Sequence, residues 1–195
     1  ARFNQLNRSQ CPWKGRSIVS PQESTITSQS VPAMVPQPAD RVLMAGLKQV
    51  KRSTTIQAPL SDVWAVIADN ALLPRWVPAV NGVSCSANGE GVGITRSCNV
   101  TMAGKAGTMV ERCVEFVPES RASYVVDDDS FGFGKMFTDY GFTTTVESLS
   151  PERTKVIIET FYRPRNSVYW LVNILMMRRQ SRGVVDDLLA GLKEF

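Results

Sequence analysis

A charged residue on the apolar face of a predicted strand is the strongest sign of chemistry in this sequence. Arg96 falls on the face of residues 93–102 that otherwise carries Ile94, Cys98, Val100 and Met102. Glu111 and Glu115 have the spacing that places them on the same face of the next strand. An unpaired buried ion is costly, so such groups are normally paired or functional. Two interpretations stay open: a structural cross-strand ion pair at the sheet edge, and a polar anchor or acid/base pair inside a pocket.

The pairing of these two strands decides which side chains meet. Residues 102–109 are nearly symmetric about their centre, which predicts a hairpin folded there. The expected pairs are Met102 with Met109, Cys98 with Cys113, and Arg96 with Glu115. A slip of one residue would exchange the two faces. The opposite parity, which turns Val110, Val114 and Phe116 inward, is therefore a competing prediction.

The absence of histidine narrows the chemistry. The 195 residues include 22 Lys and Arg, 18 Asp and Glu, and no His. This excludes Ser-His-Asp and Cys-His nucleophiles, His-based proton shuttles and His-containing zinc sites. The four Cys form no C-x-x-C pair and residues 127–129 are typical of a solvated acidic loop, so neither a metal nor a cofactor is predicted. Because the basic residues form no block, nucleic-acid binding is not predicted either.

Residues 1–46 differ in composition from the rest of the chain. They are rich in Pro, Gln and Ser, and Glu23 and Asp40 are their only carboxylates. This composition is typical of a flexible tail and also of an organelle transit peptide. The predicted location is intracellular, in the cytoplasm or, if the tail is a transit-peptide remnant, in a plastid or mitochondrion. No run reaches the roughly 18 apolar residues of a membrane span.

Residues 47–195 are predicted to form one α+β domain. A strand at 48–56 leads to a short helix capped by Ser61 and a further turn at 71–75. The next strands are predicted at 80–86, 93–102, 108–117, 122–127, 137–147 and 154–162, with tight turns typical of an antiparallel meander. A helix of about 40 Å, capped by Asn166 or Ser167, would then run to about Lys193. A curved seven-stranded sheet around this helix is expected to leave a cavity.

Several short motifs carry a family resemblance. They are Ile56-x-Ala58-Pro59-x-x-x-Val63-Trp64-x-x-Ile67-x-Asp69, Trp76-x-Pro78-x-Val80, Gly91-x-Gly93-x-x-Arg96, Glu111-Arg112 and a closing helix that ends at 188–193. Their order and spacing resemble the polyketide cyclase/dehydrase and lipid-transport branch of the START/Bet v 1-like (SRPBCC) superfamily, over residues 47–195. The resemblance implies a helix-grip fold with a hydrophobic cavity. Different members use that cavity to carry lipids, bind hormones or pathogenesis-related ligands, or cyclise and dehydrate polyketides.

The resemblance also bears on the two charged residues. Members similar to the plant lachrymatory-factor synthase use an Arg on the third strand and a Glu on the fourth, and these positions match Arg96 and Glu111. The leading hypothesis is a carrier or binding protein for a hydrophobic small molecule whose polar group Arg96 would anchor. The alternative is a cyclase, dehydratase or isomerase in which Glu111 shuttles a proton and Arg96 stabilises an oxyanion. A quinone-binding accessory protein is a further alternative.

Other side chains are candidates to line the cavity. Trp76, Tyr124 and Tyr140 are expected near the ligand or in the core packing beside it. Residues 168–177 of the long helix are apolar on nearly all sides, so Trp170, Met176 and Met177 are expected to line the cavity wall. Because Arg178, Arg179 and Arg182 follow directly, transient contact of this segment with a membrane is the alternative. The oligomeric state is left open.

Overall fold

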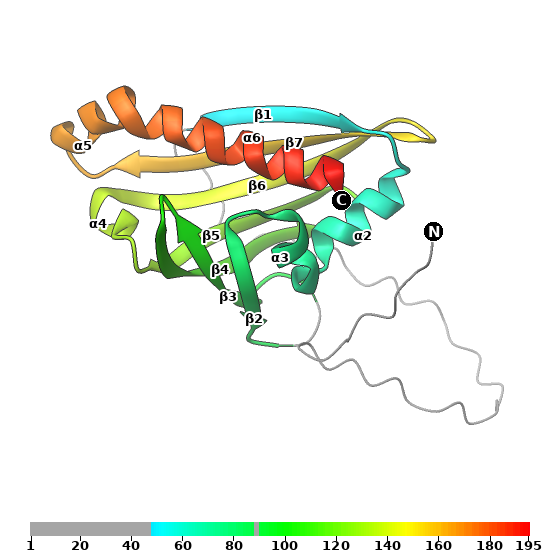
Figure 1. The fold of residues 1–195 in the computed structure, drawn as a ribbon, viewed down its shortest axis with the longest axis horizontal. Coiled ribbons are helices and arrows are strands. Elements are labelled where there is room, and N and C mark those ends of the chain that lie inside the picture. The colour runs from blue at the N-terminus through cyan, green and yellow to red at the C-terminus, as the bar shows by residue number, and fades with distance from the viewer. Residues whose placement is uncertain (1–47, 88–89) are drawn as a thin grey trace.

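The structure is a computed structural model that describes residues 48–87 and 90–195 (Figure 1). The predicted tail, residues 1–46, lies outside them. The strands are β1 (Lys48–Ile56), β2 (Val80–Cys85), β3 (Thr95–Met102), β4 (Lys105–Val117), β5 (Arg121–Asp129), β6 (Phe137–Ser150) and β7 (Arg153–Pro164). They form one antiparallel sheet in the order β1-β7-β6-β5-β4-β3-β2. The meander predicted from the turn residues is confirmed, and β1 closes it beside β7.

In Figure 1, the helices that follow β1 lie at one end of the sheet, the helix before β6 lies at the other end, and the C-terminal helix crosses one face. After β1 come α2 (Leu60–Ala68), the 3₁₀ turn η1 (Asn70–Leu72) and α3 (Leu73–Trp76), and α4 (Phe133–Met136) precedes β6. The C-terminal helix consists of α5 (Ser167–Val172), the π-helical η2 (Asn173–Met177) and α6 (Arg178–Glu194). Figure 1 shows it running across the sheet toward α2 and α3. This is the predicted α+β helix-grip architecture, and we call the sheet face that α6 covers the inner face.

The two predicted helix caps had different outcomes. The side chain of Asn166 accepts a hydrogen bond from the Tyr169 amide, as expected for an N-cap. The prediction for Ser61 is wrong, because α2 begins two residues earlier than a Ser61 cap would place it, with Pro59 at the N-cap position. Pro59 suits this place since its carbonyl still accepts the first amides of the helix. The Ser61 hydroxyl instead donates to the neighbouring Asp62 carboxylate.

The β3–β4 hairpin has a different register from the predicted one. Met102 pairs with Lys105, so only Ala103 and Gly104 form the turn, and Arg96 pairs with Glu111. Both turn residues have positive φ, 48° and 77°, as the tight type I′ turn requires. The local symmetry of residues 102–109 predicts a turn later in the chain than the observed turn at Ala103 and Gly104. The displacement is an even number of residues, so the predicted faces of β3 are kept.

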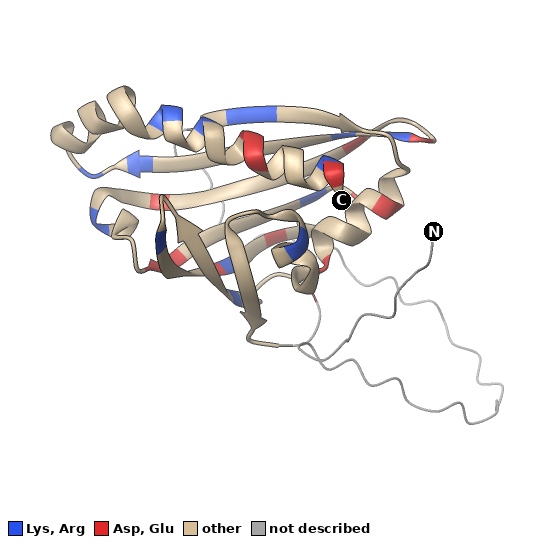
Figure 2. Ribbon diagram, viewed as in Figure 1, with Lys and Arg blue, Asp and Glu red and all other residues tan. Residues whose placement is uncertain are grey.

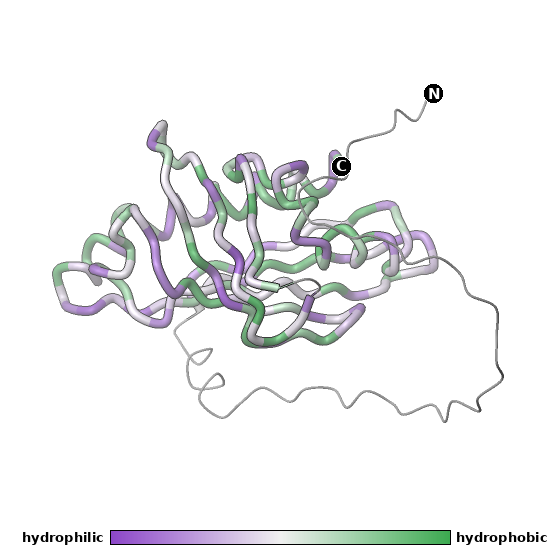
Figure 3. Tube along the Cα trace, turned by 90° about the horizontal axis from the view of Figure 1, so that it is seen from below, coloured by the Kyte–Doolittle hydropathy of each residue, from purple (hydrophilic) through white to green (hydrophobic). Residues whose placement is uncertain are grey.

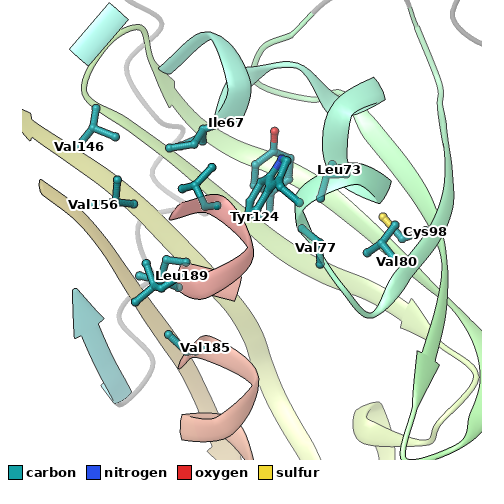
Figure 4. Packing of buried hydrophobic residues seen from close by; sticks show 14 of the residues in the cluster. Ile67, Leu73, Val77, Val80, Cys98, Tyr124, Val146, Val156, Val185 and Leu189 are labelled. Carbon is teal, nitrogen blue, oxygen red and sulfur yellow. The ribbon is translucent and has the colours of Figure 1, made fainter. Parts of the chain in front are cut away.

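The main core lies between the inner face and the helices. Hydrophobic and hydrophilic residues alternate along the strands (Figure 3), and the inward set packs against α2, α3 and α6. Figure 4 shows Val185 and Leu189 of α6 approaching Val156 and Val146 of the sheet, with Ile67 and Tyr124 nearby. The close docking of α6 on α3 needs Gly191, because a Cβ there would overlap the carbonyl oxygen of Trp76.

Candidate functional site

Arg96 and Glu111 form a buried ion pair on the inner face. They lie directly opposite each other on β3 and β4, and Arg96 Nε donates to Glu111 Oε2 at 2.7 Å. Only 5% and 10% of the two side chains are exposed. Burial alone would lower the pKa of Arg96, but the charge of Glu111, the groups of Tyr124 and Cys98, and the hydrogen bond to Glu111 together raise that pKa. The arginine is therefore a fixed cation in the interior.

The guanidinium of Arg96 lies over two aromatic rings. The Arg96 Cζ lies 3.8 Å from the centre of the Tyr124 ring and 5.7 Å from that of Phe142. These rings are stacked on each other across β5 and β6, with centroids 5.6 Å apart. A cation over an aromatic face is stabilised by the ring quadrupole, most strongly where water is excluded. Tyr124 was predicted to face inward, and its ring contacts the guanidinium of Arg96.

Asn70 of η1 joins this cluster from outside the sheet. Its Oδ1 accepts a hydrogen bond from Arg96 Nη1 at 2.6 Å, and the residue is 2% exposed. Its backbone amide and its Nδ2 both donate to the carboxylate of Glu90, at 3.1 and 2.7 Å. Asn70 therefore links the buried arginine to a second carboxylate.

Glu90 has a carboxyl group suited to proton exchange near neutral pH. Burial raises its pKa to about 7, while the hydrogen bond from the Asn70 amide and the charge of Arg96 act in the opposite direction. It is partly exposed and stands in the loop between β2 and β3, so a proton can reach it from solvent. We call Asn70, Glu90, Arg96 and Glu111 the polar cluster.

Glu115 lies on the other face of the sheet. Cys113 pairs with Tyr124 whereas Glu115 pairs with Ser123, so β4 bulges at the residue between them. The extra residue reverses the alternation of side chains beyond it. Glu115 accepts hydrogen bonds from Ser123 and pairs with Arg121 at 3.1 Å. The expected pairing of Arg96 with Glu115 is thus wrong, and the residue that meets Arg96 is Glu111.

The remaining aromatic candidates outside the C-terminal helix are Tyr140 and Trp76. Tyr140 is partly exposed and contacts the rings of Phe133 and Tyr162 edge to face, and burial raises its pKa. Trp76 is 7% exposed and packs in the main core. Its Nε1 is buried, and no described residue accepts a hydrogen bond from it. Thr160, opposite Val50 on the inner face, likewise has a buried hydroxyl with no partner within the described chain.

The candidates on the C-terminal helix are more exposed than the rest. Trp170 is 55% and Met176 49% exposed, and Met177 is partly buried. The helix buries Asn173 instead, which accepts from the Tyr162 hydroxyl at 2.7 Å and donates to Gln49 at 3.2 Å.

Outside the polar cluster, Cys98 and Cys113 are buried thiols, and Asp127 and Asp129 are hydrogen-bonded carboxylates. Burial raises the pKa of Cys98 to about 12 and that of Cys113 to about 11, so both thiols are protonated. Cys98 pairs with Met109, and both cysteines are free. Asp127 binds Arg112, and Asp129 accepts from loop amides that include those of Phe131 and Phe133. Among residues 48–87 and 90–195, no three Cys, Asp or Glu side chains are grouped to hold a metal ion.

A cleft of about 220 Å³ opens beside β5 and β6. Its lining includes Val126, residues 127–129, Tyr140 and Arg165. This is the end of the sheet near α4. The cavity expected between sheet and α6 is a separate feature and stays a prediction.

Two members of the polar cluster were missed by sequence reasoning. In the sequence, Asn70 follows the predicted short helix and Glu90 stands next to Gly89 and Gly91, positions that point to a helix end and a turn. Both approach Arg96 only through the fold, since 26 residues separate Asn70 from Arg96. The sequence offered one clue: Asn70 directly follows the motif that ends at Asp69, and Glu90 directly precedes the motif that begins at Gly91.

Comparisons with known proteins agree with this architecture. The family model described as "Polyketide cyclase / dehydrase and lipid transport" matches residues 48–194. No match to a curated protein was found. Within the described residues, no helix is both long and apolar enough to cross a membrane.

Solved structures share the fold at low sequence identity. A START superfamily protein from Mycobacterium smegmatis matches with a TM-score of 0.62 and 14% identity over 74% of this chain and 94% of its own. Zhui aromatase/cyclase from Streptomyces sp. R1128 matches at 0.57 and 18%, over 74% and 92%. Ara h 8.0201 matches at 0.54 and 14%, over 75% and 97%.

Proposed function

Because the chain belongs to the polyketide cyclase/dehydrase and lipid-transport family, we propose that it binds a hydrophobic small molecule between the sheet and the C-terminal helix, as a carrier or binding protein. The ligand class is a lipid, an isoprenoid or a polyketide-like molecule. Its polar end is held by Arg96.

The observation that carries this proposal is the buried cation of Arg96 on the inner face, in an interior where Trp76 Nε1 and Thr160 Oγ1 have no hydrogen-bond partner among the described residues. Arg96 Nε is bonded to Glu111 and Nη1 to Asn70. A buried polar group without a partner is costly, and ligand or water oxygens are its usual partners. The unpartnered Trp76 Nε1 and Thr160 Oγ1 add two further polar atoms to the same interior.

The neighbours of Arg96 suit an anchoring role. Glu111 and Asn70 fix the guanidinium in one orientation, and Tyr124 covers one of its faces. The arginine is then preorganised, so little side-chain entropy is lost when a ligand oxygen contacts the guanidinium. The apolar remainder of the ligand would contact the inner face of the sheet.

Organic extraction of the protein purified from its own host, followed by mass spectrometry, tests the proposal. We expect one chemical class of hydrophobic molecule in the wild-type extract and its loss in Arg96→Lys, which cannot reproduce the planar fork of donors. Arg112→Lys is the matched control, because Arg112 is half-exposed and pairs with Asp127. Equal extracts from all three proteins, or none from the wild type, would contradict the proposal. A quinone in the extract would instead favour the accessory-protein alternative.

Catalysis at the same cluster is the second candidate function. It is favoured by the close carboxylate and guanidinium of Glu111 and Arg96, with Glu90 able to exchange protons near neutral pH through its contact with Asn70. In a cyclase, dehydratase or isomerase, Arg96 would stabilise an oxyanion and Glu111 would move the proton. Glu111→Gln should then abolish turnover of a polyketide-like substrate with affinity within a few-fold of wild type. Loss of binding without any turnover in the wild type would exclude this candidate.

A further inference from the structure

The first half of the C-terminal helix exposes large apolar side chains to solvent. They are Val168, Trp170, Leu171, Ile174, Leu175 and Met176, which we call the apolar patch, with exposures from 44% for Ile174 to 72% for Leu175. The patch occupies α5 and η2, and Figure 1 shows this segment at the end of the sheet far from the β6–β7 turn. Contiguous apolar surface of this kind marks an interaction site.

The charge around the apolar patch is of one sign. Residues 166–177 contain no charged residue, and residues 160–185 contain no Asp or Glu. The five charged residues in the longer range are Arg163, Arg165, Arg178, Arg179 and Arg182. Figure 2 shows the uncharged α5 followed by blue positions at the start of α6. Arg179 and Arg182 are exposed, so their charges reach whatever surface the patch touches.

From this arrangement we propose that the apolar patch docks on the surface of a bilayer that contains anionic lipid. A helix with exposed Trp and Leu beside arginines lies in the plane of the interface, with its apolar side chains between headgroups and acyl chains. The flanking arginines are attracted by the negative surface potential of such a bilayer. A second copy of this chain would instead bring the arginines of two patches together, so the charge favours the lipid surface. The inference is independent of which ligand the interior binds.

Sedimentation with two kinds of vesicle tests the proposal on the full chain. Vesicles of phosphatidylcholine alone are compared with vesicles containing about a third phosphatidylserine. We expect binding to the anionic vesicles, weakened by salt because exposed charges are screened. The chain has four Trp, and the emission of Trp170 should move to shorter wavelength on binding, a shift that Trp170→Phe removes.

Surface variants separate this helix from other basic parts of the chain. Leu171→Gln with Leu175→Gln should weaken binding by about tenfold or more, and Arg179→Gln with Arg182→Gln by roughly fivefold per charge. Leu149→Gln is the matched control, since Leu149 is 50% exposed near the β6–β7 turn. No binding to anionic vesicles, or equal binding by the leucine variant and the control, would overturn the proposal. So would a dimer in light scattering that the leucine variant abolishes, because the patch would then be covered by a second copy.

Discussion

Arg96 and Glu111 are opposite partners in the β3–β4 ladder, and their side chains meet at 2.7 Å in an interior where both are at least nine-tenths buried. A pair of this kind contributes little net stability, because desolvation offsets the attraction, but each partner depends strongly on the other. That dependence has a direct experimental consequence.

Arg96→Met should lower the free energy of unfolding by about 3–5 kcal/mol, because it leaves the Glu111 carboxylate buried without its cation. Arg96→Met with Glu111→Met should recover most of this loss, since no charge is then left in the interior. Urea unfolding followed by circular dichroism at pH 7 measures both. Arg112→Met is the control, with an expected change within about 1 kcal/mol because its ion pair is partly solvated. A double variant as unstable as the single one would contradict the burial argument.

Stability should depend on pH through Glu90. The pKa of Glu90 is about 7 in the folded chain against an ordinary value of 4.5, so the folded state holds more protons than the unfolded state between these values. The free energy of unfolding therefore falls as the pH rises from about 4.5 to 7 on account of this group. Glu90→Gln should flatten that part of the pH profile, measured by urea unfolding from pH 4.5 to 8. Glu152→Gln, at an exposed turn, should leave the profile as in wild type. Profiles of the same slope for Glu90→Gln and wild type would refute this role.

The β3–β4 turn offers a stabilising change. Ala103 has φ of 48°, a region that costs an L side chain roughly 1–2 kcal/mol. Ala103→Asn should raise the free energy of unfolding by about 1 kcal/mol, because Asn-Gly is the preferred pair in a type I′ turn. Gly104→Ala should lower it by a similar amount, since Gly104 also has positive φ. Thermal and urea unfolding measure both changes, and a loss of stability in Ala103→Asn would show that the turn is of another type.

Two glycines of α6 should respond in opposite ways to alanine. Gly191→Ala places a Cβ against the carbonyl oxygen of Trp76, so α6 must move away from α3, at an expected cost of about 1–3 kcal/mol for an overpacked contact. At Gly183 no atom lies near the new Cβ, so Gly183→Ala should stabilise the helix by about 0.5–1 kcal/mol. Chemical unfolding compares them. The packing explanation fails if the two substitutions have the same sign.

The fold was predictable from the sequence because its main signals are local. Turn residues separate the strands, and the change from alternating to helical periodicity near Pro164 marks the long helix. The predicted inner face of β3 was also right, because a strand's alternation needs no knowledge of its partner. The register of the hairpin was not, since it depends on the backbone at Ala103 and Gly104.

The site was only half predictable for a physical reason. Arg96 and Glu111 can be recognised within single strands, because each is a charged residue on an apolar face. Asn70 and Glu90 carry none, because what brings them to Arg96 is the path of the chain from α2 through η1 and the loop before β3. Glu115 was misplaced because one extra residue in β4 reversed the alternation beyond Cys113. Bulges of this kind have no reliable sequence pattern.

The π-helical segment η2 sets the phase of the C-terminal helix. Val185, Leu189 and Leu192 are the buried positions of α6. Counting back three α-helical turns from Val185, about 11 residues, leads to Ile174, yet Ile174 is 44% exposed and Asn173 is the residue that turns inward. Between Asn173 and Val185 the helix therefore contains one residue more than three α-helical turns would hold. A chain shorter by one residue in this segment would rotate the helix start, bring Ile174 over Tyr162 and take Asn173 out of its hydrogen bonds. Which apolar side chains of this helix face solvent therefore depends on the extra residue in η2 as well as on the residue types.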